Sequence, residues 1–235
     1  MRPYRDPQGR KQFWYTEDEI EAAMSEVLNR RQGATGVSDV VPDIEDLLEQ
    51  GLGVVLDQYA DLARDLLGVT QFSAVRTVVQ INKDLTGAAD ADNAPPVDRA
   101  RWRSTLAHEA AHVILHKSLF EVNENQESLF DLGSADDGST YHCLKRAVGV
   151  GVRSSDPREY QANLGMAALL MPREPFLETA RRLAATMSGN GRRLGPSTVA
   201  ANRLSLQLAR QFAVSRQAAE IRLDGLGFLR VQAEL

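Results

Sequence analysis

The sequence has little of what marks secreted, membrane-bound or nucleic-acid-binding proteins. A single cysteine, Cys143, excludes an intrachain disulfide and is typical of a reducing compartment. No apolar run approaches the roughly 20 residues that a membrane-spanning helix needs, and the basic N-terminal stretch has no apolar segment like that of a signal peptide. We therefore expect a cytoplasmic protein without a membrane partner.

Basic residues are not in excess either. The chain carries 27 Lys and Arg against 32 Asp and Glu, for a formal net charge of −5. A general nucleic-acid binder usually has a basic excess, so the balance argues mildly against that class. The chain has 235 residues and is 43% hydrophobic, which is enough for one large domain or for a domain with appendages.

Periodicity and capping signals predict a mixed sequence of helices and short strands. A capping box formed by Thr16 and Glu19 marks the first helix start. The patterns predict, in order, a helix from Thr16 to about Gly33, a helix over 42–50, strands over 53–57 and 75–82, a surface loop over 83–97, a helix over 97–119, an irregular segment over 121–156, a helix over 156–172 and a mostly helical remainder.

The segment that indicates chemistry is a His-Glu-x-x-His motif on the predicted helix over 97–119. His108 and His112 are four residues apart, which places both imidazoles on one helix face within reach of one zinc ion. In this motif Glu109 is the general base for the water that the metal activates. The alternative is a helix with partly exposed histidines. The apolar residues around the motif argue against this alternative, because they predict a buried helix. Burying an unpaired His or Glu side chain there would cost free energy of folding.

Two histidines need a third ligand. His116 lies about 12 Å along the helix axis from His108, too far to bind the same ion, and Leu115 and Ser118 stand where the variant motif with a third histidine has Gly and His. A downstream carboxylate is then expected. The candidates by distance are Glu121, Glu124, Glu127, Glu159, Glu174 and Glu178.

Glu159 stands out among these candidates because it opens a predicted helix. Asn163 follows one turn later, where it can orient a metal ligand. Asp156 and Glu159 also fit a capping box, however, which needs no metal. Spacing alone leaves the two interpretations of Glu159 open.

Two motifs together resemble the ImmA/IrrE family of zinc metallopeptidases. One spans 104–116 and contains the two histidines, and the other runs from Glu159 to Asn163 and on into 167–172. The resemblance covers roughly residues 50–175. It implies that His108, His112 and Glu159 hold a zinc ion, with Glu109 as the catalytic base. The segment over 121–156, with His142 and Cys143, looks long, and the family pattern gives these two residues no role.

The resemblance also implies an α+β, zincin-like fold, in which a small mixed sheet packs on the two motif helices. We accordingly divide the chain into an N-terminal helical segment (1–51), a metallopeptidase core (52–175) and a mostly helical C-terminal region (176–235). Members of the family act on proteins, so the implied substrate is a protein partner. The family's partners are helix-turn-helix transcriptional repressors of mobile elements or stress responses.

The C-terminal region also suggests a rival function. Residues 208–223 resemble a helix-turn-helix and are locally basic, with Arg210, Arg216 and Arg222. The alternative is therefore a regulator that binds DNA, or that sequesters a repressor without cutting it, in which the zinc site is structural or vestigial. The simpler interpretation is a helical hairpin that closes the protease core.

Overall fold

The computed structural model describes most of the chain. The described residues are 1–5, 11–35, 41–73, 76–123, 140–144, 156–187 and 198–229. Among these residues, no helix is both long enough and apolar enough to cross a membrane.

Helices dominate the described part of the chain, and the strands are short. The elements in order are β1 (Arg2–Arg5), β2 (Lys11–Trp14), α1 (Glu17–Thr35), α2 (Ile44–Asp46), the π-helical turn η1 (Leu47–Gly51), β3 (Val55–Ala60), β4 (Leu66–Phe72), β5 (Thr77–Asn82), α3 (Lys83–Asp90), α4 (Pro96–Asn123), β6 (Thr140–Leu144), α5 (Pro157–Leu170), α6 (Arg173–Met187), α7 (Val199–Gln211) and α8 (Arg216–Gly225).

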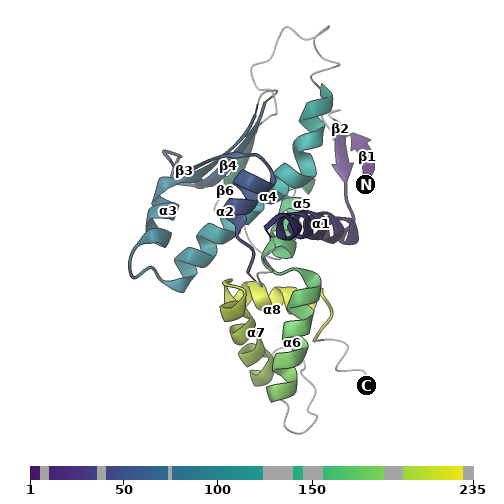
Figure 1. Ribbon diagram of the computed structural model, residues 1–235, viewed down its shortest axis with the longest axis vertical. Helices are drawn as coiled ribbons and strands as arrows, with labels where there is room; N and C mark the ends of the chain where they lie inside the picture. The colour runs from purple at the N-terminus through teal and green to yellow at the C-terminus, as the bar shows by residue number, and fades with distance from the viewer. Residues whose placement is uncertain are drawn as a thin grey trace.

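A four-stranded mixed sheet forms one side of the molecule (Figure 1). Its strand order is β3-β5-β4-β6, and β3 runs parallel to β5 while β4 is antiparallel to both β5 and β6. A separate two-stranded hairpin pairs β1 with β2. The α+β class with a small mixed sheet, expected from the sequence, is confirmed.

Helix α4 lies between the sheet and the other helices and carries the core. Its residues from Leu106 to Val113 are all buried, including small alanines that let neighbouring elements approach closely. One side of α4 packs on β4 and the other on α5. Polar side chains on this stretch are consequently removed from water and need partners within the protein.

The contact between α4 and α5 is unusually close at Gly165. A Cβ atom placed on Gly165 would lie 2.7 Å from the Cβ of Ala111 and 3.3 Å from the Cε of Met24 on α1. Only glycine therefore permits this separation of the two helices. Three helices, α1, α4 and α5, meet at this point.

The N-terminal segment is fastened to α5 by a buried amide. Gln161 accepts a hydrogen bond from the backbone N–H of Tyr15 (3.2 Å) and donates one to the carbonyl of Phe13 (3.2 Å). The predicted capping box is present, because Thr16 N–H donates to Glu19 (2.9 Å) and Glu19 N–H donates to the Thr16 hydroxyl (3.3 Å). α1 therefore begins where the sequence predicts.

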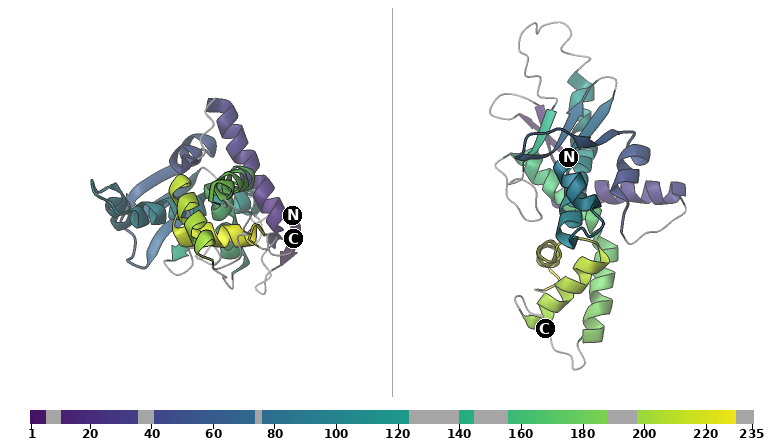
Figure 2. Two further views of the ribbon diagram at one scale, coloured as in Figure 1. Left: turned by 90° about the horizontal axis from the view of Figure 1, so that it is seen from below. Right: turned by 90° about the vertical axis from the view of Figure 1, so that its left-hand side faces the viewer.

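The C-terminal helices α6, α7 and α8 gather at one end of the molecule, away from the sheet (Figures 1 and 2). Phe176 and Phe212 pack edge to face inside this group, with ring centroids 5.2 Å apart. Arg222 on α8 is buried. It donates to the carbonyl of Met171 and forms a two-pronged ion pair with Glu21 on α1. The group is thereby fastened to the rest of the protein.

Three expectations about secondary structure are corrected. The predicted loop over 83–97 contains α3, which Asn82 caps by accepting from the N–H of Asp84 (2.9 Å). α1 continues through the expected end at Gly33 to Thr35. The segment over 121–156, expected to be irregular, contains the last turn of α4 and also β6, while 124–139 and 145–155 lie outside the described residues.

The close approach at Gly165 leads to a stability prediction. Gly165→Ala should destabilise the protein by about 1–3 kcal/mol, because the methyl group overpacks the contact between α4 and α5. It should also weaken metal binding, because α5 carries Glu159. Urea unfolding and zinc titration would measure both effects.

Gly33→Ala is the matched control, since Gly33 is also within a helix but has no atom within 4 Å of an added Cβ. That change should be neutral or slightly stabilising. Equal stability of the two variants would contradict the proposed role of the close contact.

Candidate metal centre

Two histidines on α4 direct their ring nitrogens to one point. The Nε2 atoms of His108 and His112 are 3.1 Å apart, and both side chains are fully buried. Their spacing of four residues on a continuous helix produces this arrangement, as the sequence predicts.

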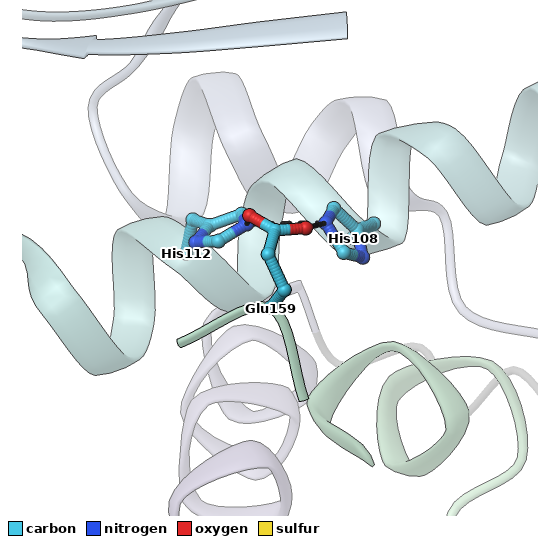
Figure 3. A group of neighbouring side chains, drawn as sticks. All are labelled: His108, His112 and Glu159. Atoms are coloured by element: carbon cyan, nitrogen blue, oxygen red, sulfur yellow. Dashed lines mark hydrogen bonds and ion pairs between the residues drawn. The ribbon is translucent and has the colours of Figure 1, made fainter. Parts of the chain in front are cut away.

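Glu159 completes a group of three at the start of α5 (Figure 3). One carboxylate oxygen lies 3.2 Å from Nε2 of His108 and the other lies 3.2 Å from Nε2 of His112. Of the described residues, these three form the group whose ligand atoms lie within 4.8 Å of one another. The two imidazoles and the carboxylate come from different helices and converge on one location.

The distances in this group suit a metal ion. Ligand atoms placed 2.0–2.1 Å from a tetrahedral zinc ion are about 3.3 Å apart, close to the observed 3.1 and 3.2 Å. Glu159 Oε2 is buried and accepts no well-aligned hydrogen bond from the described residues. Two imidazoles and one carboxylate are also a donor set that catalytic zinc sites use. The residues present therefore fit a bound divalent cation.

The rival interpretation of Glu159 was that it only caps its helix. Asp156 is the N-cap of α5, and its side chain accepts a hydrogen bond from the N–H of Arg158 (2.9 Å). Glu159 instead directs both carboxylate oxygens at the histidines. Asp156 thus caps α5, while the carboxylate of Glu159 lies beside the two histidines.

Further side chains contact the outer nitrogens of the two histidines. Nδ1 of His108 lies 3.2 Å from the side-chain oxygen of Asn163. An amide oxygen only accepts hydrogen bonds, so His108 donates through Nδ1 and, when neutral, keeps the lone pair of Nε2 for a metal. Nδ1 of His112 lies 3.1 Å from Nδ1 of His116. His116 therefore contacts His112 on the side away from Glu159.

Glu109 faces the sheet from the next position on α4. Its carboxylate is fully buried, and Oε2 accepts a hydrogen bond from the hydroxyl of Thr70 on β4 (2.5 Å). Oε1 has no hydrogen-bond partner within the described part of the chain. Sequence reasoning identified Glu109 but missed Thr70, because nothing in the pattern of β4 marks a contact with a helix 39 residues away.

Burial and charge shift the titration of these groups. Burial raises the pKa of Glu109 above its ordinary value. Burial also opposes the charge on Glu159, but the contacts of its carboxylate with His108 and His112 outweigh burial and hold the pKa of that carboxyl well below its usual range. Burial lowers the pKa of His116 well below its ordinary value, so its imidazole is neutral.

Two of the other candidates for the third ligand, Glu174 and Glu178, are exposed on α6, outside this group. Glu124 and Glu127 lie outside the described residues, and the structure places only the backbone of Glu121, His142 and Cys143.

A comparison with protein-family models identifies the region around Glu159. Residues 149–224 match the model of the IrrE N-terminal-like domain, peptidase family M78. The resemblance to the ImmA/IrrE family is confirmed over these residues. The matched region contains Glu159 and Asn163 and continues through α6, α7 and α8, whereas His108 and His112 precede it. No curated protein matches the chain. The family match supports a metallopeptidase-type function, and the buried group of two histidines and a glutamate is able to hold a metal.

The two roles considered for Glu159 predict different effects on metal binding. Glu159→Gln should lower zinc affinity by more than about 100-fold, because losing a ligand costs more than losing a hydrogen-bond partner of a ligand. Asp156→Ala removes the N-cap at a typical cost of about 1 kcal/mol and should retain the metal. Zinc dissociation constants would measure the difference, with one zinc ion per chain expected in the wild type. Wild-type affinity in Glu159→Gln would assign the third ligand to another residue.

Proposed function

We propose that the protein is a zinc-dependent endopeptidase that hydrolyses a peptide bond in a protein partner. His108, His112 and Glu159 are the proposed zinc ligands, and Glu109 is the proposed general base. The observation that carries the proposal is the convergence of two Nε2 atoms and one carboxylate within 3.2 Å, with a second buried carboxylate at the adjacent position of α4.

His108, His112 and Glu159 would hold the zinc ion, which when bound would supply polarisation of the scissile carbonyl and a lowered pKa of water. Glu109 takes a proton from the attacking water, whose oxygen forms a bond to the carbonyl carbon. The C–N bond then breaks, and Glu109 returns the proton to the leaving amine. The raised pKa of Glu109 suits this role, because a base that must also release its proton works best with a pKa near the operating pH.

The family resemblance extends the proposal to the partner. We infer that the substrate is a helix-turn-helix transcriptional repressor, and that the enzyme acts in the cytoplasm. The support for both is the family resemblance. We also propose the division of the chain into parts at residues 1–51, 52–175 and 176–235.

The general base provides the decisive variant. Glu109→Gln should fold and bind one zinc ion, because all three proposed ligands remain, but it should lose cleavage by about 100-fold or more, since general acid–base catalysis typically contributes 10²–10⁴-fold. Cleavage of candidate repressors and of a fluorogenic peptide library, alongside elemental analysis, would test this. A wild-type rate in Glu109→Gln, or a zinc-loaded wild type that binds a repressor without cutting it, would reject the peptidase mechanism.

DNA binding by α7 and α8 is the rival function. Arg222 on α8 is buried against Glu21 and Met171, and Arg216 pairs with Glu220 (2.8 Å) and Asn202 (3.2 Å). Neither arginine is free for a phosphate without breaking these contacts. We therefore propose that the C-terminal helices complete the protease fold.

A salt titration tests this choice. Binding through several phosphate contacts weakens by roughly 10³–10⁵-fold between 50 and 200 mM salt. We expect fluorescence anisotropy with a labelled duplex to show no binding of this kind at 50 mM salt. Tight, salt-dependent binding would favour the DNA-binding alternative.

A further inference from the structure

The general base on α4 is held by a residue of the sheet. The hydroxyl of Thr70 on β4 donates to Oε2 of Glu109 over 2.5 Å, and both side chains are fully buried. A hydrogen bond to an ionised carboxylate is shorter and about twice as strong as one between neutral groups. Thr70 therefore restricts rotation of the Glu109 carboxylate about its last side-chain bond.

Gly68 faces the same carboxylate from two residues earlier on β4. Residues two apart in a strand point to the same side of the sheet, so Gly68 and Thr70 both face α4. A Cβ atom on Gly68 would lie 2.6 Å from Oε1 of Glu109 and 3.1 Å from its Cδ and Cγ atoms. Any side chain at position 68 would displace the carboxylate. Glycine leaves the space that Oε1 occupies.

The strand itself does not need the Thr70 hydroxyl. The position of Thr70 in the sheet is set by backbone pairing, opposite Val79 of β5 and Tyr141 of β6. The hydroxyl is thus available for the carboxylate. Its partner is the one carboxylate in the site that is not directed at His108 and His112.

We propose that Thr70 and Gly68 are positioning residues for the general base. Thr70 fixes Oε2 of Glu109, and Gly68 leaves room for Oε1, which is the oxygen that takes the proton from water and returns it to the leaving amine. Thr70 keeps its own proton throughout and transfers nothing. The inference rests on the proposed peptidase function, because it assigns separate tasks to the two oxygens of its base.

The first test removes the hydroxyl while keeping the side-chain shape. Thr70→Val should lower kcat by roughly 10- to 100-fold, since misplacing a reacting group by about 1 Å can cost 10²-fold. KM should stay within about twofold and zinc content should be unchanged, because no proposed ligand is touched. Thr70→Ser restores the donor and should recover most of kcat. Cleavage of a peptide that the wild type cuts would be measured for all three proteins.

Thr86→Val is the matched control. Thr86 on α3 is buried, and its hydroxyl donates to the carbonyl of Gln58 over 2.5 Å, so the same change removes a comparable bond outside the site. It should lower stability without changing kcat. A wild-type kcat in Thr70→Val would overturn the positioning role and leave the peptidase proposal standing. So would an equal loss of kcat in Thr86→Val.

Glycine supplies a second, independent variant. Gly68→Ala should displace the Glu109 carboxylate and lower kcat at least tenfold with zinc retained. Gly87→Ala on α3 is its control, because an added Cβ there has no atom within 4 Å. A wild-type kcat in Gly68→Ala would show that catalysis does not depend on the space that Gly68 leaves for Oε1 of Glu109. It would overturn the positioning role of Gly68.

A measurement without substrate separates the contact from the catalysis. In a double-mutant cycle, the losses in urea midpoint caused by Thr70→Val and Glu109→Ala should not add, because each change breaks the same bond. The pair Thr86→Val and Glu109→Ala should be additive. Additive losses for Thr70 and Glu109 would overturn the inference even if the enzyme is active. If the losses for Thr70 and Glu109 are not additive but the zinc-loaded protein cuts no peptide, the contact is confirmed and the proposed peptidase function is rejected.

Discussion

The separation of α4 and α5 is the distance on which the group of His108, His112 and Glu159 depends. His108 and His112 belong to one helix and Glu159 to the other, so no local spacing brings the three together. Their approach is set where Gly165 meets Ala111, with no room for a side chain between the helices. A helix pair this close holds the carboxylate within 3.2 Å of both imidazoles. Packing of small residues thus determines the geometry of the charged ones.

Burial makes this arrangement costly unless each polar group has a partner. His108, Glu109, His112 and His116 lie within nine residues of α4 and are at most 1% exposed. Asn163 and Thr70 satisfy the outer nitrogen of His108 and one oxygen of Glu109. The Nε2 atoms of His108 and His112 lie 3.1 Å apart, and the Glu159 carboxylate lies beside both of them. A divalent cation there would neutralise Glu159 and use the lone pairs of both Nε2 atoms, so the buried network favours a metal within it.

The sequence predicts the interactions between residues that are close in the chain better than those between distant residues. His108 and His112 are about one helical turn apart, so their spacing in the sequence predicts that they lie side by side. Glu159 lies 51 residues after His108 and on another helix, so spacing in the sequence leaves its role undecided. Thr70 could not be found at all, because its role depends on the pairing of β4 within the sheet. The segment 83–97 is rich in Asp, Ala, Asn and Pro, a composition that favours a loop, whereas Asn82 caps its first part as the helix α3.

The family match and the packing together indicate that the C-terminal helices belong with the site. The matched region, 149–224, begins before Glu159 and ends with α8. Arg222 near the end of that region binds the carbonyl of Met171, the residue that ends the helix carrying Glu159, and also pairs with Glu21 on α1. Because α1 and α4 both pack on α5, this buried arginine links the last helix to the frame that sets the ligand distances. The segment that resembles a helix-turn-helix in the sequence therefore has its last arginine, Arg222, buried in the protein interior.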